Sequence, residues 1–120
     1  MIREEIVAVI PAFDCGTTIG EVVAGARRYL GDVVVVSDGS RDDTAARALA
    51  AGASVEVLPE NRGKGYALRR GIDLALARQP AALVLLDGDG QHDPADIPAL
   101  VGLWDRGGVD LVVGARLQDS

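Results

Sequence analysis

The stretch Leu83-Val-Leu-Leu-Asp-Gly-Asp-Gly-Gln-His-Asp-Pro94 joins an apolar run to two carboxylates and then to a helix start. The apolar run is typical of a strand buried on both faces of a parallel sheet. Asp87 and Asp89 stand two positions apart, so in an extended chain both side chains project to the same side. Gly88 and Gly90 let a phosphate or a sugar approach the backbone closely. Oxygen ligands of this kind suit Mg²⁺ or Mn²⁺, so the stretch predicts phosphate chemistry at a strand end.

A purely structural interpretation of the same stretch also exists. It is an Asp-Gly turn followed by Asp93 as a helix N-cap and Pro94 at the first helical position. An EF-hand calcium loop does not fit, because its sixth position is His92 rather than Gly and its twelfth is Pro98 rather than Glu. A lone His beside an N-cap is more typical of a hydrogen-bonded loop residue than of a general base. The pattern of the surrounding elements is needed to choose between a cation site and a turn that leads into a helix.

Strand and helix patterns alternate along the chain. Strands are expected over residues 5–10, 33–37, 54–58, 82–87 and 109–113. Four are continuous apolar runs, whereas Ser54-Val-Glu-Val-Leu58 alternates and indicates an edge strand. Apolar stripes predict helices over residues 19–30, 43–51, 67–76 and 97–104; Thr18 and Glu21 form a capping box, and Gly31 and Gly52 act as stops. The order predicts an α/β fold, a three-layer α/β/α sandwich with a mostly parallel, Rossmann-like sheet.

Composition limits the class of protein. The 120 residues predict a single domain over residues 1–120 with no linker. Only 3% of the residues are aromatic and the net charge is −6, so no basic field or stacking platform favours nucleic acid as a partner. The acidity indicates a site that needs a cation before it accepts a diphosphate.

The single cysteine and the apolar runs bear on location. Cys15 excludes an internal disulfide and is more typical of a small buried or loop residue than of a nucleophile. The longest apolar run, residues 81–86, is too short to span a bilayer, and the first residues do not resemble a signal peptide. A cytoplasmic location is therefore expected, with the inner face of the membrane as the alternative.

Polar loops follow the predicted strands at the sheet edge where parallel α/β proteins bind ligands. Asp38-Gly-Ser-Arg-Asp-Asp-Thr44 suits a nucleoside base or ribose, although Asp42 or Asp43 also fits a helix cap. Asn61-Arg-Gly-Lys-Gly65 suits phosphate, but it matches neither the P-loop nor the dinucleotide fingerprint, and glycines that merely start a helix explain it equally well. With Pro11-Ala-Phe-Asp-Cys15 after the first predicted strand and the Asp-x-Asp segment after the fourth, four polar loops converge at this edge and predict a binding pocket.

Five segments together resemble the family 2 glycosyltransferases of the GT-A fold, most closely the polyprenyl-phosphate (dolichyl-phosphate) mannosyl and glucosyl transferases. These segments are Val9-Ile-Pro-Ala-Phe13, Val35-Val-Ser-Asp-Gly-Ser-Arg-Asp-Asp-Thr44, Asn61-x-Gly-Lys-Gly65-x-Ala67-Leu68-x-x-Gly71, Asp87-Gly-Asp-Gly-Gln-His-Asp-Pro94 and Val112-Val-Gly-Ala-Arg116. They cover essentially the whole chain in the family's order.

The resemblance implies a nucleotide-sugar donor site with Mg²⁺ or Mn²⁺. In that family the Asp-x-Asp and the following Gln handle the cation on the donor diphosphate. The implied metal ligands are Asp89 and Gln91, and the implied donor-binding residues are Pro11, Phe13, Cys15, Val36, Asp38, Asp87, Gly88, Asp89 and Arg116. Within this set, Asp38 with Val36 would hold the base and ribose, and Arg116 would meet the diphosphate.

Three departures from the family pattern stand out. Phe13-Asp14-Cys15 replaces the usual Tyr-Asn-Glu, and Ser37-Asp38 replaces the usual Asp-Asp. Family members also continue for roughly as long again beyond the position of Ser120, into the segment that carries acceptor contacts and often the catalytic base. The expectation is a donor-binding half, truncated on its C-terminal side, with no catalytic residue identified.

The expected function is an inverting, metal-dependent glycosyltransferase that uses a GDP- or UDP-sugar, with a lipid phosphate as acceptor. The alternatives are a non-catalytic nucleotide-sugar-binding or interaction module and a nucleotidyltransferase of the same fold type. The last is disfavoured because residues 11–16 are acidic and short of glycine, where such enzymes carry a basic Gly-rich loop. The missing half would leave a sheet edge or apolar face uncovered, so a homo-oligomer is expected.

Overall fold

The computed structural model describes residues 2–90, 93–105 and 111–113. Strands and helices alternate in it as the sequence predicts. In chain order the elements are β1 (Arg3–Ala12), α1 (Ile19–Arg27), β2 (Leu30–Asp38), α2 (Thr44–Ala50), β3 (Ser54–Leu58), α3 (Lys64–Leu76), β4 (Ala82–Leu85), the 3₁₀ turn η1 (Pro94–Asp96), α4 (Ile97–Asp105) and β5 (Leu111–Val113).

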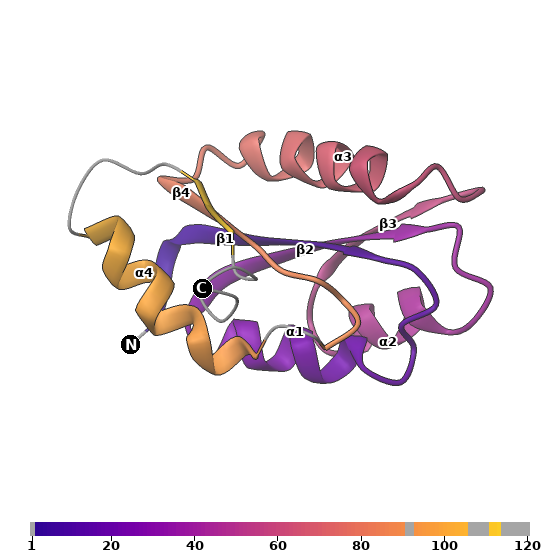
Figure 1. Cartoon of the computed structure of the whole chain (residues 1–120), viewed down its shortest axis with the longest axis horizontal. Helices are drawn as coiled ribbons and strands as arrows, with labels where there is room; N and C mark the ends of the chain where they lie inside the picture. Colours follow the sequence, from indigo (N-terminus) through magenta and orange to yellow (C-terminus); the bar gives the residue numbers. More distant parts are fainter. Residues whose placement is uncertain (1, 91–92, 106–110, 114–120) are drawn as a thin grey trace.

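These five strands form one sheet in the order β3-β2-β1-β4-β5 (Figure 1). Each of the described pairings is parallel; for example, Ile10 of β1 pairs with Val35 of β2, and Val9 pairs with Leu85 of β4. The chain order reverses at β1, because β2 and β3 lie on one side of it and β4 and β5 on the other. This is the strand order of a doubly wound fold, so the predicted parallel, Rossmann-like sheet is confirmed.

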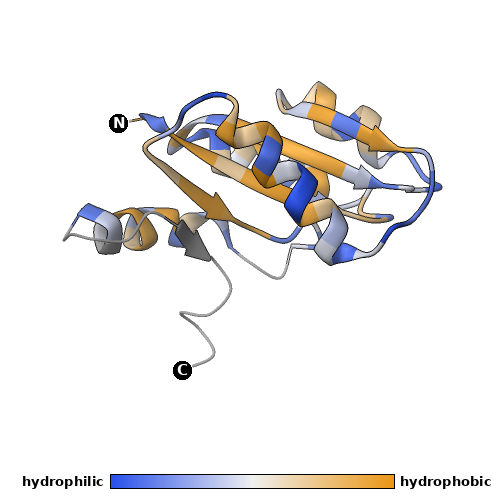
Figure 2. Ribbon diagram, turned by 90° about the horizontal axis from the view of Figure 1, so that it is seen from above, coloured by the Kyte–Doolittle hydropathy of each residue, from blue (hydrophilic) through white to orange (hydrophobic). Residues whose placement is uncertain are grey.

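Helices cover both faces of the sheet, which makes three layers (Figure 1). On one face, Ile6, Ala8 and Ile10 of β1 pack into a core shared with α1, α2 and α4. On the other face, Val7 and Val9 pack against α3. Successive β1 side chains therefore enter opposite cores, which explains why the central strands are hydrophobic along their length (Figure 2). The predicted α/β/α sandwich is confirmed.

Strand β3 lies at one edge of the sheet, as its alternating sequence predicts. Its side chains differ in exposure: Val57 is 59% exposed, whereas Leu58 is buried beside α3. The Glu56 carboxylate forms an ion pair with Arg70 of α3. The ion pair ties the edge strand to the helix that covers it.

The first helix ends earlier than its apolar stripe predicts. α1 stops at Arg27, and Leu30, expected in the helix, is instead the first residue of β2. The Tyr29 carbonyl accepts a hydrogen bond from the Arg3 backbone N–H at 2.8 Å, so pairing with β1 has already begun there. Gly31, expected as a helix stop, lies within β2, where a Cβ would stand 2.6 Å from the Cα of Glu4. It allows two strands to approach closely.

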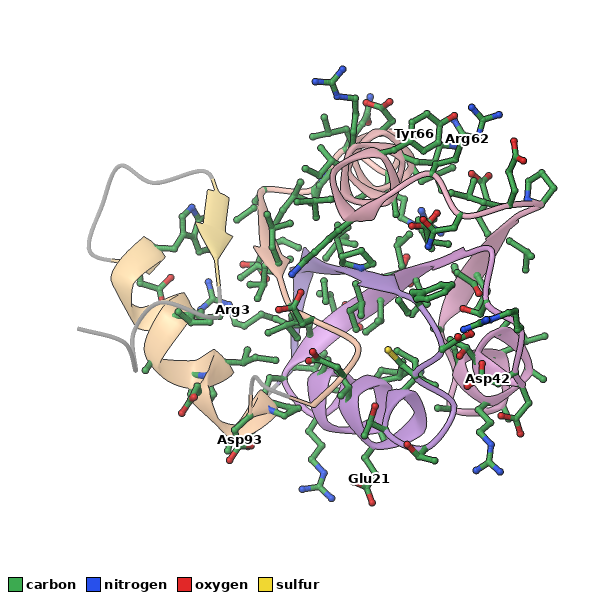
Figure 3. All side chains as sticks on the ribbon, turned by 45° about the vertical axis from the view of Figure 1, so that its right-hand side comes forward. Arg3, Glu21, Asp42, Arg62, Tyr66 and Asp93 are labelled. Carbon is green, nitrogen blue, oxygen red and sulfur yellow. The ribbon has the colours of Figure 1, made fainter. Side chains whose placement is uncertain are left out.

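The start of β1 and the end of α4 are held together by one arginine. The Arg3 guanidinium pairs with the Asp105 carboxylate at 2.9 Å and lies 5.4 Å from the centre of the Trp104 ring (Figure 3). At the other end of α4, the Asp93 carboxylate accepts a hydrogen bond from the Ala95 N–H at 2.9 Å, with Pro94 following it. The predicted Asp-Pro cap is confirmed, although it opens a 3₁₀ turn that leads into the helix.

Candidate nucleotide-sugar site

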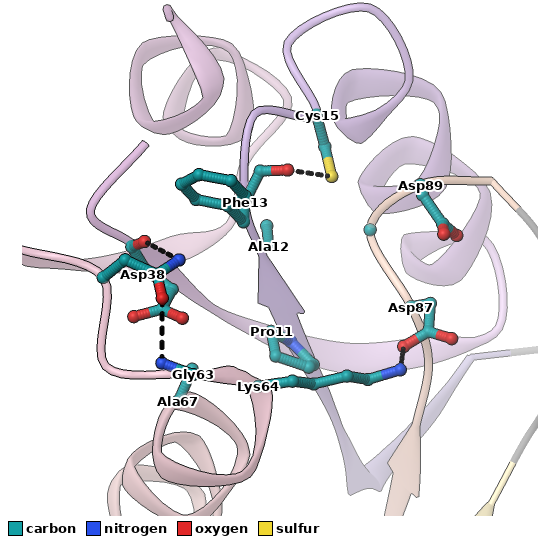
Figure 4. A pocket seen from close by; sticks show the side chains of 12 residues that line it. Pro11, Ala12, Phe13, Cys15, Asp38, Gly63, Lys64, Ala67, Asp87 and Asp89 are labelled. Atoms are coloured by element: carbon teal, nitrogen blue, oxygen red, sulfur yellow. Dashed lines mark hydrogen bonds and ion pairs between the residues drawn. The ribbon is translucent and has the colours of Figure 1, made fainter. Parts of the chain in front are cut away.

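A cavity of about 270 Å³ opens at the carboxyl ends of the strands (Figure 4). It adjoins the crevice between β1 and β4, the topological switch point where doubly wound folds bind ligands. Four loops contribute to its walls. The described residues that line it are Pro11, Ala12, Phe13 and Cys15 at and after the end of β1, Asp38 at the end of β2, Asn61 and Gly63 before α3, Lys64 and Ala67 in its first turn, and Asp87, Gly88 and Asp89 after β4.

The Asp-x-Asp segment is a turn rather than the end of a strand. β4 was predicted to reach Asp87 but ends at Leu85; the Leu86 N–H donates one more ladder bond to the Val9 carbonyl at 3.1 Å. Residues 88 and 89 then form a turn, so the extended geometry that would place both carboxylates on one side does not apply. Asp87 and Asp89 nevertheless both line the cavity.

Thr18 fixes the Asp-x-Asp turn against the start of α1. Its hydroxyl donates to the Gly88 carbonyl at 2.8 Å and caps no helical N–H, so the predicted capping box with Glu21 is wrong. Gly88 itself packs tightly, because a Cβ at this position would lie 3.0 Å from the Cβ of Ala12 and 3.1 Å from the Cδ1 of Ile19. A side chain at this position would have to displace Ala12 or Ile19 by a few tenths of an ångström.

Asp38 is only 3% exposed and organises the loop that leads into α3. Its carboxylate accepts a hydrogen bond from the Arg62 N–H at 2.7 Å, and its carbonyl accepts one from the Asn61 side-chain amide at 3.3 Å. Gly39 has φ +66°, and a Cβ there would lie 2.3 Å from the Asn61 nitrogen. Val36, expected beside Asp38, is completely buried under α3 and is not among the residues that line the cavity.

The loops after β1 and β2 are joined by hydrogen bonds. Thr44 accepts a bond from the Cys15 N–H at 2.9 Å, and the Asp42 carboxylate accepts one from the Gly16 N–H at 3.0 Å. The Asp42 carboxylate also accepts a hydrogen bond from the N–H of Thr44, the first residue of α2, at 3.0 Å. The Asp43 carboxylate instead pairs with the Arg47 guanidinium at 2.6 Å. Asp43 occupies the N-cap position of α2 without a side-chain cap bond, so of the two predicted capping residues Asp42 is the one that bonds a helical N–H.

The β1 side of the cavity presents one aromatic ring and one thiol (Figure 4). Phe13 is 43% exposed, and the Arg41 guanidinium lies 5.6 Å from the centre of its ring. The Cys15 thiol is buried and lies 3.2 Å from the Phe13 carbonyl, to which it donates. Burial raises the pKa of the Cys15 thiol, so it stays protonated near neutral pH. This agrees with the expectation that Cys15 is not a nucleophile.

Lys64 crosses the cavity from α3 toward the Asp-x-Asp turn (Figure 4). Its ammonium lies 2.5 Å from Oδ1 of Asp87. Gly63, with φ +95°, precedes the helix, so the Gly63-Lys-Gly65 segment does start a helix, one of its two predicted interpretations. The sequence predicted Lys64 only as part of a segment that suits phosphate, and did not predict its contact with Asp87.

The charge of the cavity wall suits a divalent cation. Three carboxylates, those of Asp38, Asp87 and Asp89, face one ammonium, that of Lys64, among the described lining residues. In the described parts of the chain no three His, Cys, Asp or Glu side chains gather to form a protein cage for a metal. One or two carboxylates completed by water and substrate phosphates are the usual arrangement for Mg²⁺. Asp87 and Asp89 fit that donor set.

Several predicted residues lie outside the described part of the chain. They are Gln91 and His92, which follow the Asp-x-Asp turn, and Arg116, the predicted diphosphate ligand. Their roles stay predictions.

A family model described as glycosyl transferase family 2 matches residues 7–120. The chain belongs to this family. A relative of unassigned function in Methanocaldococcus jannaschii is 37% identical over 119 residues, which cover 98% of this chain and 49% of that protein. The dodecaprenyl-phosphate galacturonate synthase of Rhizobium johnstonii is 34% identical over 124 residues, covering 93% of this chain and 36% of that enzyme.

An enzyme of known structure shares the fold. Glucosyl-3-phosphoglycerate synthase of Mycobacterium tuberculosis, in complex with Mn²⁺, UDP-glucose and phosphoglyceric acid, superposes with a TM-score of 0.67 at 32% identity. The match covers 82% of this chain and 38% of that one. Our chain thus spans about half the length, or less, of these relatives. Within its described residues, every helix is too short or too polar to cross a membrane.

Proposed function

We propose that the cavity binds the donor of a family 2 glycosyltransferase, a nucleoside-diphosphate sugar, together with Mg²⁺ or Mn²⁺. The observation that carries this proposal is the placement of Asp87 and Asp89 with Asp38 around one cavity at the switch point of the sheet. A polar rim of this kind on an otherwise apolar sheet is the default binding site of the fold.

The carboxylates divide the proposed donor site into two ends. Asp87 and Asp89, beside β4, would hold the cation and the diphosphate. Asp38, beside β2, would face the ribose and base, and Phe13 with Pro11 would form the nearby wall. When bound, the cation neutralises negative charge on the departing diphosphate. The hydrogen bond from the Arg62 N–H to Asp38 and the one from the Thr18 hydroxyl to the Gly88 carbonyl hold the surrounding loops in place.

The relatives support this class of donor. The mycobacterial synthase binds UDP-glucose with Mn²⁺ in its crystal structure. For the acceptor, the name of the Rhizobium enzyme supports a polyprenyl phosphate, and we propose that class here. Inversion at the anomeric carbon stays a prediction from the family resemblance, and a cytoplasmic location, with the inner face of the membrane as the alternative, stays a prediction from the sequence.

A non-catalytic nucleotide-sugar-binding module is the second candidate. Both candidates require donor binding, and they differ in sugar transfer to a polyprenyl phosphate. A radiolabelled transfer assay with UDP- and GDP-sugars separates them.

Asp89→Asn tests the donor site itself. The variant should weaken binding of UDP- or GDP-sugars in Mn²⁺ by at least about tenfold, or ~1.4 kcal/mol, because an amide is a weaker ligand for a hard cation. Isothermal titration calorimetry measures the change. Asp73→Asn is the matched control: this acid is exposed on α3 and is not among the lining residues, so its removal should leave affinity unchanged. Equal affinities for both variants would remove Asp89 from the site.

A further inference from the structure

The contact between Lys64 and Asp87 links two loops that would both meet the donor diphosphate. The ammonium of Lys64 lies 2.5 Å from Oδ1 of Asp87; Lys64 is the first residue of α3, and Asp87 lies two residues beyond the end of β4. The Asp87 side chain is 16% exposed, whereas that of Lys64 is 66% exposed. A largely buried carboxylate is thus covered by a long side chain that reaches it from solvent (Figure 4).

The start of α3 makes this position unfavourable for a cation unless an anion is near. Helix N-termini carry a partial positive charge, and Lys64 is the first residue of the helix. No acidic side chain lies in the first turn, and no side chain caps the helix. The positive end of the helix and the positive side chain of its first residue therefore both face the cavity. Asp87 supplies the compensating negative charge, and a phosphate would supply it equally well.

The surroundings of Lys64 allow it to change partner. It lies between Gly63 and Gly65, and a Cβ at either glycine would meet no atom within 4 Å. The lysine stem is flexible and its ammonium bonds as a point charge, so it can reach a second anion without a fixed geometry. Lys64 is also the only lysine in the chain.

We propose that Lys64 is a built-in counter-ion of Asp87, which a divalent cation must displace and which then pairs with the donor diphosphate. The proposal rests on the proposed donor site and adds a coupling to it. Before the cation binds, the ammonium competes with it for Asp87 and lowers its affinity. Once a diphosphate is present, the same ammonium gains a new partner. Cation and nucleotide therefore favour each other's binding, and this coupling is reciprocal.

Lys64→Met separates this role from simple phosphate binding. Methionine keeps the length of the side chain and removes the charge. The variant should bind Mn²⁺ alone at least about threefold more tightly, because the competing ammonium is gone, and should bind UDP or GDP in saturating Mn²⁺ about tenfold more weakly. Electron paramagnetic resonance of Mn²⁺ measures the first affinity and calorimetry the second. Tighter binding of Mn²⁺ together with weaker binding of the nucleotide is the result expected if Lys64 exchanges Asp87 for the diphosphate.

Arg69→Met is the matched control, because it removes one positive charge from an exposed position of α3 that is not among the lining residues. It should leave the nucleotide affinity unchanged and raise Mn²⁺ affinity far less than Lys64→Met does. Unchanged or weaker Mn²⁺ binding in Lys64→Met would overturn the counter-ion role. Failure of the unmodified protein to bind UDP or GDP with Mn²⁺ would instead overturn the donor site. The Mn²⁺ titrations alone would then still show whether Lys64 competes with the cation for Asp87.

A second measurement needs neither the Lys64 variant nor a ligand. Reductive methylation with ¹³C-formaldehyde labels Lys64 as the one lysine, apart from the chain terminus. Its NMR signal should move when Asp87 is changed to Asn and stay in place in Asp73→Asn. A Lys64 signal that is identical in Asp87→Asn and the unmodified protein would show that the two side chains do not pair, and would overturn the proposal.

Discussion

Asp14 and Arg41 determine how the Phe13 wall of the cavity is held. The Asp14 carboxylate accepts hydrogen bonds from the Arg41 backbone N–H and from its guanidinium, both at 2.7 Å. The Ser40 hydroxyl accepts the Asp14 N–H at 3.1 Å. Asp14 has φ +49°, a left-handed conformation that Asp adopts more readily than most residues. Because the same guanidinium lies against the Phe13 ring, the ion pair positions a residue of the proposed donor site.

This ion pair predicts a pH dependence of stability. The hydrogen bonds from the Arg41 backbone and guanidinium lower the pKa of Asp14 below its ordinary value. Stabilisation from a lowered carboxyl pKa is complete above the unfolded value of about 3.9 and is lost as the pH falls through the folded value. We therefore expect Asp14→Asn to be less stable than the unmodified chain near neutral pH, with a smaller difference below about pH 4.

Urea denaturation at about pH 7 and about pH 3 measures that difference. Asp73→Asn serves as the control, since its carboxyl lies on the exposed face of α3. A gap between Asp14→Asn and the unmodified chain that is equal at both pH values would show that Asp14 contributes no linked protonation.

At the scale of elements, α3 lies close to the sheet because of one glycine. A Cβ at Gly71 would stand 2.6 Å from Cγ1 of Val9 and 3.3 Å from Cγ2 of Val36, both in fully buried strand residues. Such a contact forces the helix or the strands to move. Lys64 begins the same helix, so the seating of α3 also sets where its ammonium reaches.

Two identical substitutions in α3 test this packing. Gly71→Ala should destabilise the fold by about 1–3 kcal/mol through overpacking. Gly65→Ala, where a Cβ meets no atom within 4 Å, should be neutral or stabilising by up to about 1 kcal/mol, because alanine favours helix. Urea denaturation compares them. Equal stabilities would mean that α3 does not depend on glycine for its approach to the sheet.

The strands were predictable because the buried runs are continuously apolar, and their parallel pairing was expected from the helices between them; their order in the sheet comes from the structure. Element ends were less predictable. Leu30 continues the stripe of α1, yet pairing of Tyr29 with Arg3 starts β2 instead. Thr18 stands where a capping residue is expected, but its hydroxyl donates a hydrogen bond to the Gly88 carbonyl, far away in the chain. In both cases a tertiary partner outcompetes a local preference.

The candidate site shows the same limit. Convergence of loops at the carboxyl ends of parallel strands follows from topology, so Pro11, Phe13, Asp38 and the Asp-x-Asp turn could be assigned to one rim from sequence. The Lys64 contact could not, because it depends on how closely α3 approaches β4 in space. Its distance to Asp87 is a property of packing, with no local sequence signal.

At the scale of the whole molecule, charge and architecture act together. Both faces of the sheet are covered by helices, which leaves the rim at the strand ends as the place where polar loops meet. The described lining residues carry three carboxylates against one ammonium, in a chain of net charge −6. A diphosphate approaching this rim meets negative charge unless a cation accompanies it. Donor binding that depends on a divalent cation is therefore the central claim.

The most direct test is calorimetric titration of the unmodified chain with UDP- and GDP-sugars, first in Mn²⁺ and then in excess chelator. Removal of the cation should weaken binding by at least about tenfold, or ~1.4 kcal/mol, since Asp87 and Asp89 would then face the diphosphate directly. A far-UV circular dichroism spectrum in chelator controls for loss of fold. Equal affinity with and without Mn²⁺ would contradict the account.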